Sequence, residues 1–175
     1  MTETFRIAKP RDAESLSLLV NSTYRGESSR CRWTTEAELL GGQRTDPGAL
    51  RELISANSNA ILLMHWDAGL IGCVHLQKKS QSAYLGMLTV RPGLQASGIA
   101  KRLLAAAEDW VFENWRSQVV EMTVIRQRTE LIAWYERRGY VDTHRTEPFP
   151  YGDEKFGLPK RPDLEFVVLE KCLCR

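Results

Sequence analysis

The sequence lacks the features that would place it in several large classes of protein. It contains no apolar run approaching the roughly 18 residues of a membrane-spanning helix, and its first residues lack the apolar core of a signal peptide. Its 24 basic and 22 acidic side chains leave a formal net charge of only +2, which gives no electrostatic reason to expect a nucleic acid or a membrane as partner. We therefore expect a cytoplasmic globular protein.

Cysteine and histidine are too few and too scattered to indicate a metal site. Among the four cysteines, Cys172 and Cys174 form the one close pair, and their spacing is tighter than that of the usual zinc ligands. We therefore expect no bound metal and interpret the cysteines as reduced thiols. The glycine motifs G-x-x-x-x-G-K-[ST] and G-x-G-x-x-G, which mark two common nucleotide-binding folds, are also missing.

The composition that remains is that of one folded unit. Hydrophobic residues make up 43% of the 175 residues and charged residues 26%, which suits a globular domain with a substantial core. No internal repeat or low-complexity tract divides the chain. We therefore expect residues 1–175 to form a single domain.

Apolar periodicity predicts a mixed α/β fold. Alternating or continuous apolar stretches predict strands at residues 4–8, 60–66, 70–76, 85–90, 119–125, 140–145 and 164–169. Capping signals predict helices that begin after Asp12, Thr35 and Asp46, the second of them ending at residues 41–42. Two more helices are predicted from Ile99 onward and over residues 129–138. Hairpins combined with a strand–helix–strand crossover indicate a mixed sheet.

The stretch at residues 85–107 is the most informative part of the chain. A buried strand over 85–90 is followed by a helix that opens with mostly small residues, Gln95, Ala96, Ser97, Gly98, Ile99 and Ala100. The unpaired N–H groups of a first helical turn and the helix dipole bind anions, and Lys101 adds a positive charge. The pattern predicts a diphosphate cradle, and an ordinary strand-to-helix turn is the alternative from spacing alone.

The same residues resemble a known family. Residues 95–100 match the Q/R-x-x-G-x-G/A signature of GNAT-type N-acetyltransferases, with Ala100 at a position that is often glycine. Residues 87–92 look like the family's strand 4, and residues 134–140 are similar to its second signature, at the end of helix 4. The resemblance covers residues 5–169. It implies a twisted, mainly antiparallel sheet flanked by helices, with strands 4 and 5 splayed apart to admit acetyl-CoA.

The resemblance also implies an activity, the transfer of acetyl from acetyl-CoA to an amine. Tyr135 matches the tyrosine that in relatives donates a proton to the departing CoA sulfur. Leu88 and Val90 match the strand positions whose backbone groups pair with the pantetheine arm, and the amides of residues 95–100, with Lys101, would hold the diphosphate. Relatives often carry asparagine where this chain has Arg128, so the contact made there differs.

The sequence does not single out the general base. Glu121 is the first candidate, because a strand glutamate that faces the cleft is placed to take the proton of the amine; a solvent-facing strand position is the alternative. Glu27 and His75 are further candidates, with a solvated loop as the alternative for Glu27 and strand packing as the alternative for His75, and Tyr84 is placed to relay a proton through water.

The acceptor site is expected between residues 24–33 and 149–156. These segments carry aromatic side chains that would form walls and acidic side chains that would attract a cation: Tyr24, Trp33, Phe149 and Tyr151, and Glu27, Asp153 and Glu154. We therefore expect a small-molecule amine as substrate. The alternatives are a protein lysine or N-terminus as acceptor, and a non-catalytic protein that binds acetyl-CoA. A homodimer is left open.

Overall fold

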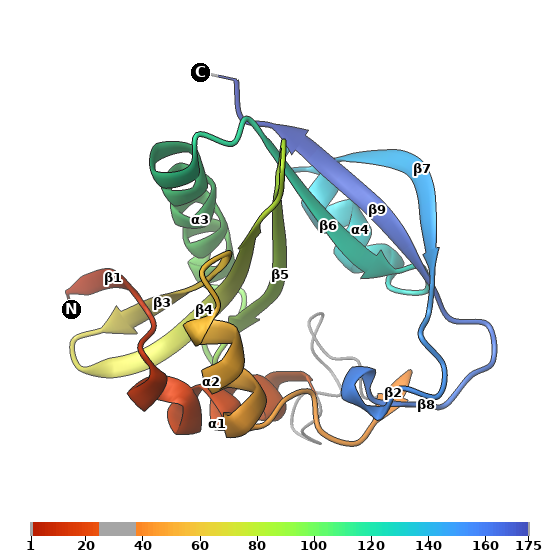
Figure 1. Cartoon of the computed structure of the whole chain (residues 1–175), viewed down its shortest axis with the longest axis horizontal. Coiled ribbons are helices and arrows are strands. Elements are labelled where there is room, and N and C mark those ends of the chain that lie inside the picture. The colour runs from red at the N-terminus through yellow and green to blue at the C-terminus, as the bar shows by residue number, and fades with distance from the viewer. Residues whose placement is uncertain (1, 25–37, 175) are drawn as a thin grey trace.

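The computed structural model of the protein describes residues 2–24 and 38–174. Its main sheet contains the strands β1 (Glu3–Ile7), β3 (Asn59–Trp66), β4 (Gly69–Lys78), β5 (Ala83–Val90), β6 (Val119–Ile125), β7 (Val141–Pro148) and β9 (Glu165–Cys172). These seven lie in the order β1-β3-β4-β5-β6-β9-β7 (Figure 1). Only β5 and β6 are parallel, and every other neighbouring pair is antiparallel. A small second sheet joins β2 (Leu40–Gly41) to β8 (Leu158–Pro159).

Helices cover both faces of the main sheet. The α-helices are α1 (Ala13–Tyr24), α2 (Pro47–Ser55), α3 (Ile99–Trp115) and α4 (Thr129–Glu136), with 3-10 turns η1 (Pro10–Asp12) and η3 (Glu154–Phe156). In Figure 1, α1 and α2 lie together on one side of β3, β4 and β5, away from α3. Across the described residues, no helix combines the length and the apolar character needed to cross a membrane.

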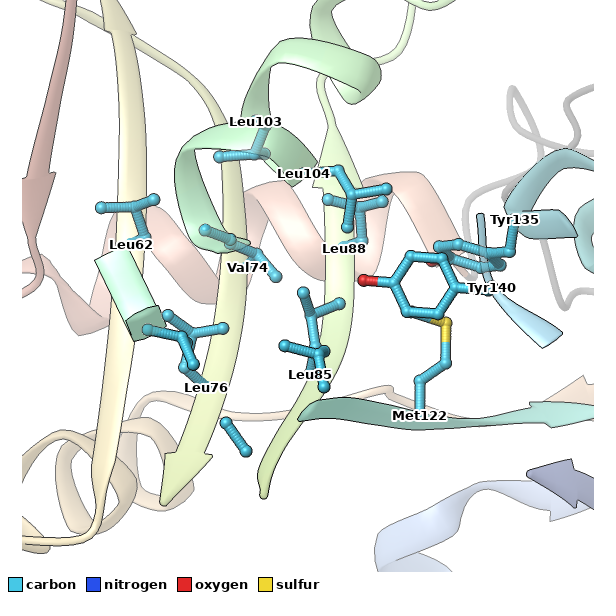
Figure 2. Close-up of a cluster of buried hydrophobic side chains, with 14 of the residues drawn as sticks. Leu62, Val74, Leu76, Leu85, Leu88, Leu103, Leu104, Met122, Tyr135 and Tyr140 are labelled. Atoms are coloured by element: carbon cyan, nitrogen blue, oxygen red, sulfur yellow. The ribbon is translucent and has the colours of Figure 1, made fainter. Parts of the chain in front are cut away.

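The alternation of side chains along β3 divides the core between these helices. Leu62 and Met64 belong to the cluster that contains Leu103 of α3, whereas Ile61 and Leu63 pack in the cluster of α1 and α2. Successive strand residues point to opposite faces, so this apolar run, buried on both sides, follows from helices above and below. Figure 2 shows the α3 cluster extending from Leu62 across β4 and β5 to Tyr135 and Tyr140.

The predicted fold class is confirmed, and most predicted elements lie close to their predicted positions. The strand at Val119–Ile125 matches its prediction at both ends, and Asp46 caps α2 by accepting the N–H of Ala49 at 3.0 Å. The splay of the two central parallel strands is confirmed as well, because β5 and β6 share only two residue pairs.

Two helix predictions differ from the structure in part. Thr35 lies outside the described residues, and the expected end of its helix is instead the strand β2, whose Leu40 is buried with Ile125, Phe149 and Leu164. Pairing with the distant β8 overrides the local capping signal there. Asp12 does not cap α1 in the expected way, because its carboxylate accepts the N–H of Lys9 at 2.7 Å and binds Arg6 at 2.8 Å.

The interpretation of the cysteines as reduced thiols is wrong for one pair. Cys172 and Cys174 form a disulfide at the end of β9, with Cα atoms 5.5 Å apart. Alternate residues of an extended chain point to the same side, so this spacing brings the two sulfur atoms together. Cys73 is a buried free thiol, and Cys31 lies outside the described residues. The cysteines therefore no longer support the expected reducing compartment.

Candidate active site

The site forms where β5 and β6 separate. The two strands pair only where Ala83 faces Val120 and Tyr84 faces Glu121. Beyond these pairs they diverge (Figure 1), and a cavity of about 290 Å³ lies between them and α4. A parallel pair that opens in this way leaves facing backbone groups without a neighbouring strand, which suits an extended ligand.

A bulge in β5 shapes the wall of this cavity. Met87 has φ +53°, and the register between β4 and β5 shifts between Cys73 and His75. An extra residue of this kind bends a strand and changes the direction of its side chains. The bulge therefore lies between the part of β5 that pairs with β6 and the part that faces the opening.

Leu88 and Val90, the two residues predicted to pair with the pantetheine arm, have backbone carbonyl groups that already accept hydrogen bonds within the protein. The hydroxyl of Tyr24 donates to the carbonyl of Leu88 at 2.7 Å. The carbonyl of Val90 accepts from Thr23 Oγ1 and from Gln95 Nε2, both at 3.3 Å. Backbone pairing with a pantetheine arm at these positions therefore depends on their N–H groups. The N–H of the next residue, Arg91, donates to Ile71 of β4, so that of Val90 points away from β4.

The predicted cradle lies at the other end of the opening, at the start of α3. Ala96 has φ +70° and Gly98 φ +76°, and both line a second cavity of about 230 Å³ with Ala100 and Lys101. A Cβ added to Gly98 would lie 3.3 Å from Arg102 Nη1. The left-handed backbone and the small side chains let an anion approach the amides closely.

Two residues of the cradle motif have side chains buried inside the protein. The side chain of Ile99 is 1% exposed and belongs to the core, and Gln95 is 8% exposed with its amide directed at Val90. The motif therefore holds the turn in place from inside the protein while its amides and small side chains face the cavity. Ser97 supports the same turn, because its hydroxyl donates to the carbonyl of Leu94 at 2.5 Å.

Sequence reasoning missed a cation that completes the cradle. Arg138 lines the same cavity, with its guanidinium 3.6 Å from the ring centroid of Trp134 and Nη1 donating to the carbonyl of Trp134 at 2.7 Å. Such stacking fixes the plane of a guanidinium. The available signal was the arginine pair at residues 137–138, inside the second family signature.

Tyr135 lies at the wall of the first cavity, 5% exposed. Its ring packs edge-on against Trp134 and Tyr140, with centroids 5.1 and 5.6 Å away, and Figure 2 shows it beside Tyr140 at one end of the buried cluster. Burial raises the pKa of the Tyr135 hydroxyl above its usual range, and Arg128 acts in the opposite direction. The hydroxyl therefore stays protonated throughout the neutral range.

Glu121 lines the cavity as predicted, but its carboxylate is engaged in ion pairs. Lys79 Nζ lies 3.2 Å from one oxygen and Arg145 Nη2 3.6 Å from the other, and its side chain is 17% exposed. The hydroxyl of Ser82 donates to the same carboxylate at 3.4 Å. To act as a base, this carboxylate would have to give up its contacts with two cations when it accepts a proton.

The other base candidates differ in their access to the cavity. His75 is bound to Asn59 Oδ1 at 2.7 Å, and burial lowers its pKa to about 4. Tyr84 lines the cavity, and its hydroxyl forms a 3.3 Å hydrogen bond with Thr123 Oγ1. A Cβ added to Gly86 would lie 2.8 Å from the Tyr84 ring, so the missing side chain lets that ring lie along β5. Glu27 is outside the described residues.

The expected acceptor walls are only partly at the cavity. Tyr24 lines it, whereas Phe149 is buried in the cluster with Leu40. Tyr151 donates its hydroxyl to the carbonyl of Arg161 at 2.9 Å and does not reach the cavity. Phe156, at the end of the same segment, does line it. Of the predicted aromatic walls that lie in the described residues, Tyr24 is therefore at the cavity and Phe149 and Tyr151 are not, while Phe156 was not predicted as a wall.

The two predicted acidic residues that lie in the described part of the chain, Asp153 and Glu154, do not line the cavity either. Asp153 caps η3 by accepting the N–H of Lys155, and Glu154 lines a separate surface depression. Trp33 lies outside the described residues. Within the described residues no group of three His, Cys, Asp or Glu side chains could hold a metal ion.

Comparisons with known proteins agree with this geometry. A sequence model of the acetyltransferase (GNAT) domain matches residues 21–149, and no curated protein matches the chain significantly. The fold is similar to an N-acetyltransferase from Thermoplasma acidophilum in complex with coenzyme A, with TM-score 0.70, 18% identity and coverage of 98% and 99% of the two chains. It is also similar to the spermidine/spermine N-acetyltransferase of Vibrio cholerae, with TM-score 0.70, 16% identity and coverage of 98% and 94%.

A ribosomal-protein alanine N-acetyltransferase of Escherichia coli has the same fold, with TM-score 0.70, 13% identity and coverage of 99% and 96%. At sequence identities this low, the structural similarity shows a shared fold alone. The sequence model goes further, because it spans well over half of the chain and includes both β5 and α4. The chain therefore belongs to the GNAT acetyltransferase family.

Proposed function

We propose that this protein uses acetyl-CoA to acetylate the primary amine of a small molecule by direct attack on the thioester. The observation that carries the proposal is a pair of cavities along β5 and α4. Leu88 and Tyr135 line the cavity where β5 and β6 separate, and the adjacent residues Val90 and Trp134 line the cavity at the start of α3. We further propose that residues 1–175 act as one domain, since β9 lies between β6 and β7 and thus joins the chain beyond the matched residues to the same sheet.

The described residues fit the parts of acetyl-CoA. The amides at Ala96, Gly98 and Ala100 would hold the diphosphate, with Lys101 and Arg138 as cations beside it. The N–H groups of Leu88 and Val90 would face the pantetheine arm. When bound, the co-substrate supplies the thioester that the amine attacks.

The residues near the thioester address the two proton transfers of the reaction. A new N–C bond forms as the C–S bond breaks, and Tyr135 donates a hydrogen bond to the departing sulfur. Before attack, an amine with a pKa of about 10.4 must lose a proton at pH 7, which costs about 4–5 kcal/mol. Tyr84 and Thr123 offer hydroxyl groups through which water could carry that proton away.

Thermal denaturation with added acetyl-CoA tests the co-substrate. At about 100 times its Kd the ligand is expected to add about 2.7 kcal/mol to the free energy of unfolding. Gly98→Val should abolish the shift in Tm, because a branched side chain fills the cradle. Gly152→Val is the matched control: Gly152 also has positive φ, +88°, but no heavy atom lies within 4 Å of its added Cβ and it is far from the cradle in the sequence.

Release of free thiol from acetyl-CoA tests the transfer. We expect release to depend on an added small amine and to exceed release with lysine-bearing or free N-terminal peptides. Absence of a thermal shift with the unmodified protein would contradict the co-substrate. A peptide with kcat/KM at least tenfold above every small amine, about 1.4 kcal/mol in transition-state binding, would reverse the choice of acceptor.

A further inference from the structure

A buried carboxylate lies within the apolar face of α3. Of the buried residues of this helix, Glu108 is the one with an ionisable side chain, and it is 8% exposed. It follows Leu104 by about one helical turn, so the two side chains lie on the same face. Removing a charged group from water is costly unless other groups pair with it and donate hydrogen bonds to it. The partners of Glu108 therefore show what this carboxylate holds together.

Both oxygens of the Glu108 carboxylate accept hydrogen bonds from other parts of the chain. The hydroxyl of Tyr140 donates to Oε1 at 2.9 Å, and Nζ of Lys171 donates to Oε2 at 2.7 Å. The Lys171 ammonium also lies 5.6 Å from the centroid of the Tyr140 ring. We call these three side chains the Glu108 network. They connect α3 to β9 and to the residue that follows the turn at the end of α4.

Tyr140 in turn contacts Tyr135. Its backbone N–H donates to the carbonyl of Tyr135 at 3.3 Å, and the two rings pack edge-on with their centroids 5.6 Å apart. Both residues are buried in the same cluster, and they lie next to each other in Figure 2. Closely packed side chains do not move independently. A displacement of the Tyr140 ring is therefore expected to displace the ring of Tyr135.

The position of α3 gives the network a role in the geometry of the site. The proposed diphosphate cradle lies at the start of α3, whereas Tyr135 is carried by α4. The sulfur of CoA is joined covalently to the diphosphate, so the place of a bound sulfur depends on α3. The hydrogen bond between Glu108 and Tyr140 ties the end of α4 to the same helix. It thereby relates the Tyr135 hydroxyl to the groups that would hold the co-substrate.

Stability alone does not account for the network. Replacing a buried ion pair by apolar side chains of similar volume is often neutral or stabilising, because two charges have to leave water. An apolar side chain in place of Glu108 would extend the cluster that already contains Tyr140. A carboxylate differs from such a side chain because the hydrogen bond to it fixes the direction of the Tyr140 hydroxyl and hence the placement of the ring.

We propose that Glu108 and Tyr140, with Lys171 balancing the charge of Glu108, are positioning residues that hold the Tyr135 hydroxyl where the CoA sulfur departs. This inference rests on the proposed function. Misplacing a reacting group by about 1 Å costs up to about 100-fold in rate. A network that fixes the Tyr135 ring therefore acts on the chemical step, and its loss should leave the binding of acetyl-CoA nearly unchanged.

A double-mutant cycle of Tyr140→Phe and Tyr135→Phe tests the proposal through single-turnover thiol release. Tyr140→Phe keeps the ring and removes its hydrogen bond to Glu108. We expect it to lower the rate about threefold to tenfold on its own, and by less than about 1.5-fold when Tyr135→Phe is also present. The rise in Tm with acetyl-CoA should be the same in both cases. Equal fractional losses with and without Tyr135→Phe, or no loss in either, would overturn the inference.

Variants of Glu108 test whether the hydrogen bond does the positioning. The amide oxygen introduced by Glu108→Gln still accepts the Tyr140 hydroxyl, whereas Glu108→Leu offers no acceptor. We expect Glu108→Gln to keep about half of the rate or more, and Glu108→Leu to lose about as much as Tyr140→Phe. Equal losses in the two Glu108 variants would contradict the assignment of this hydrogen bond. The amine is the one among phenethylamine, ethanolamine and spermidine that the unmodified protein acetylates fastest.

Tyr151→Phe is the matched control. The Tyr151 hydroxyl also makes two hydrogen bonds, donating to the carbonyl of Arg161 at 2.9 Å and accepting the N–H of Leu164 at 2.8 Å. Tyr151 lines neither the cavity between β5 and β6 nor the cradle. Its substitution should therefore leave the single-turnover rate unchanged, with or without Tyr135→Phe.

Fluorine NMR observes the Tyr135 ring without any substrate. In protein that contains fluorotyrosine, the signal missing from Tyr135→Phe belongs to Tyr135. Glu108→Leu leaves the rings of Tyr135 and Tyr140 in the chain, so a displaced or broadened signal reports a change in how they lie. We expect such a change in Glu108→Leu and none in Tyr151→Phe. An unchanged Tyr135 signal in Glu108→Leu would overturn the inference.

These measurements separate the inference from the proposed function. If acetyl-CoA raises Tm and an amine is acetylated, but the cycle is additive or the Tyr135 signal does not move, only the inference fails. If acetyl-CoA gives neither a shift nor amine-dependent thiol release, the proposed function fails and the inference fails with it.

Discussion

Replacing Tyr135 by phenylalanine tests the part of the mechanism that the structure constrains most closely. Burial holds the pKa of the Tyr135 hydroxyl above its usual value of 10, whereas a departing thiol has a pKa of about 8.5. Complete proton transfer from tyrosine to thiolate would therefore be uphill. The hydroxyl should act mainly by donating a hydrogen bond to the developing negative charge on sulfur.

The size of the effect follows from that role. A hydrogen bond to a charged group contributes about 1.5–3 kcal/mol, so Tyr135→Phe should lower kcat by about 10–100-fold, the low end of general acid catalysis. The loss should be the same at every pH from 6 to 9. A group whose pKa lies above 10 stays protonated throughout this range, so removing it removes no titration from the profile.

Single-turnover thiol release measures this effect, because it isolates the chemical step from product release. Stability is the control. Phenylalanine keeps the ring contacts with Trp134 and Tyr140, and within the described residues the Tyr135 hydroxyl has no hydrogen-bond partner, so Tm should change little. An unchanged single-turnover rate across pH 6 to 9 would assign Tyr135 to packing alone.

Further expectations concern the wall of the cavity and the acid stability of the fold. Gly86→Ala should displace the ring of Tyr84 and raise KM for the acceptor while acetyl-CoA still raises Tm; an unchanged KM would show that this ring does not contact the acceptor. The ion pair with Arg6 lowers the pKa of Asp12 to about 2, so the roughly 2 kcal/mol it contributes above pH 4 should be lost between pH 4 and pH 2 and be absent in Asp12→Asn. Burial lowers the pKa of His75 to about 4, so the unfolded chain binds this proton first and up to about 3 kcal/mol should be lost from pH 6.5 to pH 4. Chemical denaturation of His75→Gln over that range should show a flatter profile.

The part of the site proposed to bind acetyl-CoA, the donor half, could be predicted because it is built from residues that are close together in the sequence. The turn at the start of α3 is built from consecutive residues, and the groups proposed to bind the diphosphate are backbone amides whose placement depends on Gly98 and its small neighbours. A short motif can therefore specify it completely. The same holds for Tyr135, whose position on α4 is fixed by the residues immediately around it.

The part of the site that would bind the amine, the acceptor half, could not be predicted in this way. Arg44, Arg128 and Phe156 reach one cavity from three distant segments, and no periodicity in the sequence places them together. Glu121 illustrates the difference: its strand and its position at the cavity were predicted correctly, but the ion pairs with Lys79 and Arg145 depend on tertiary contacts. The strand Leu40–Gly41 was missed for the same reason, because its partner lies over a hundred residues away in β8.

This division between local and long-range information has a chemical consequence. The groups that would bind acetyl-CoA lie on β5, α3 and α4, whereas Arg44 reaches the cavity from the segment before α2. Arg128 is common to both halves, since it precedes the helix that carries Tyr135 and also lines the cavity. Its charge acts on the Tyr135 hydroxyl, so Arg128→Gln should change both KM for the amine and the single-turnover rate of thiol release. Arg44→Gln should change KM for the amine with little effect on that rate, and measuring both quantities in the two variants would separate these effects.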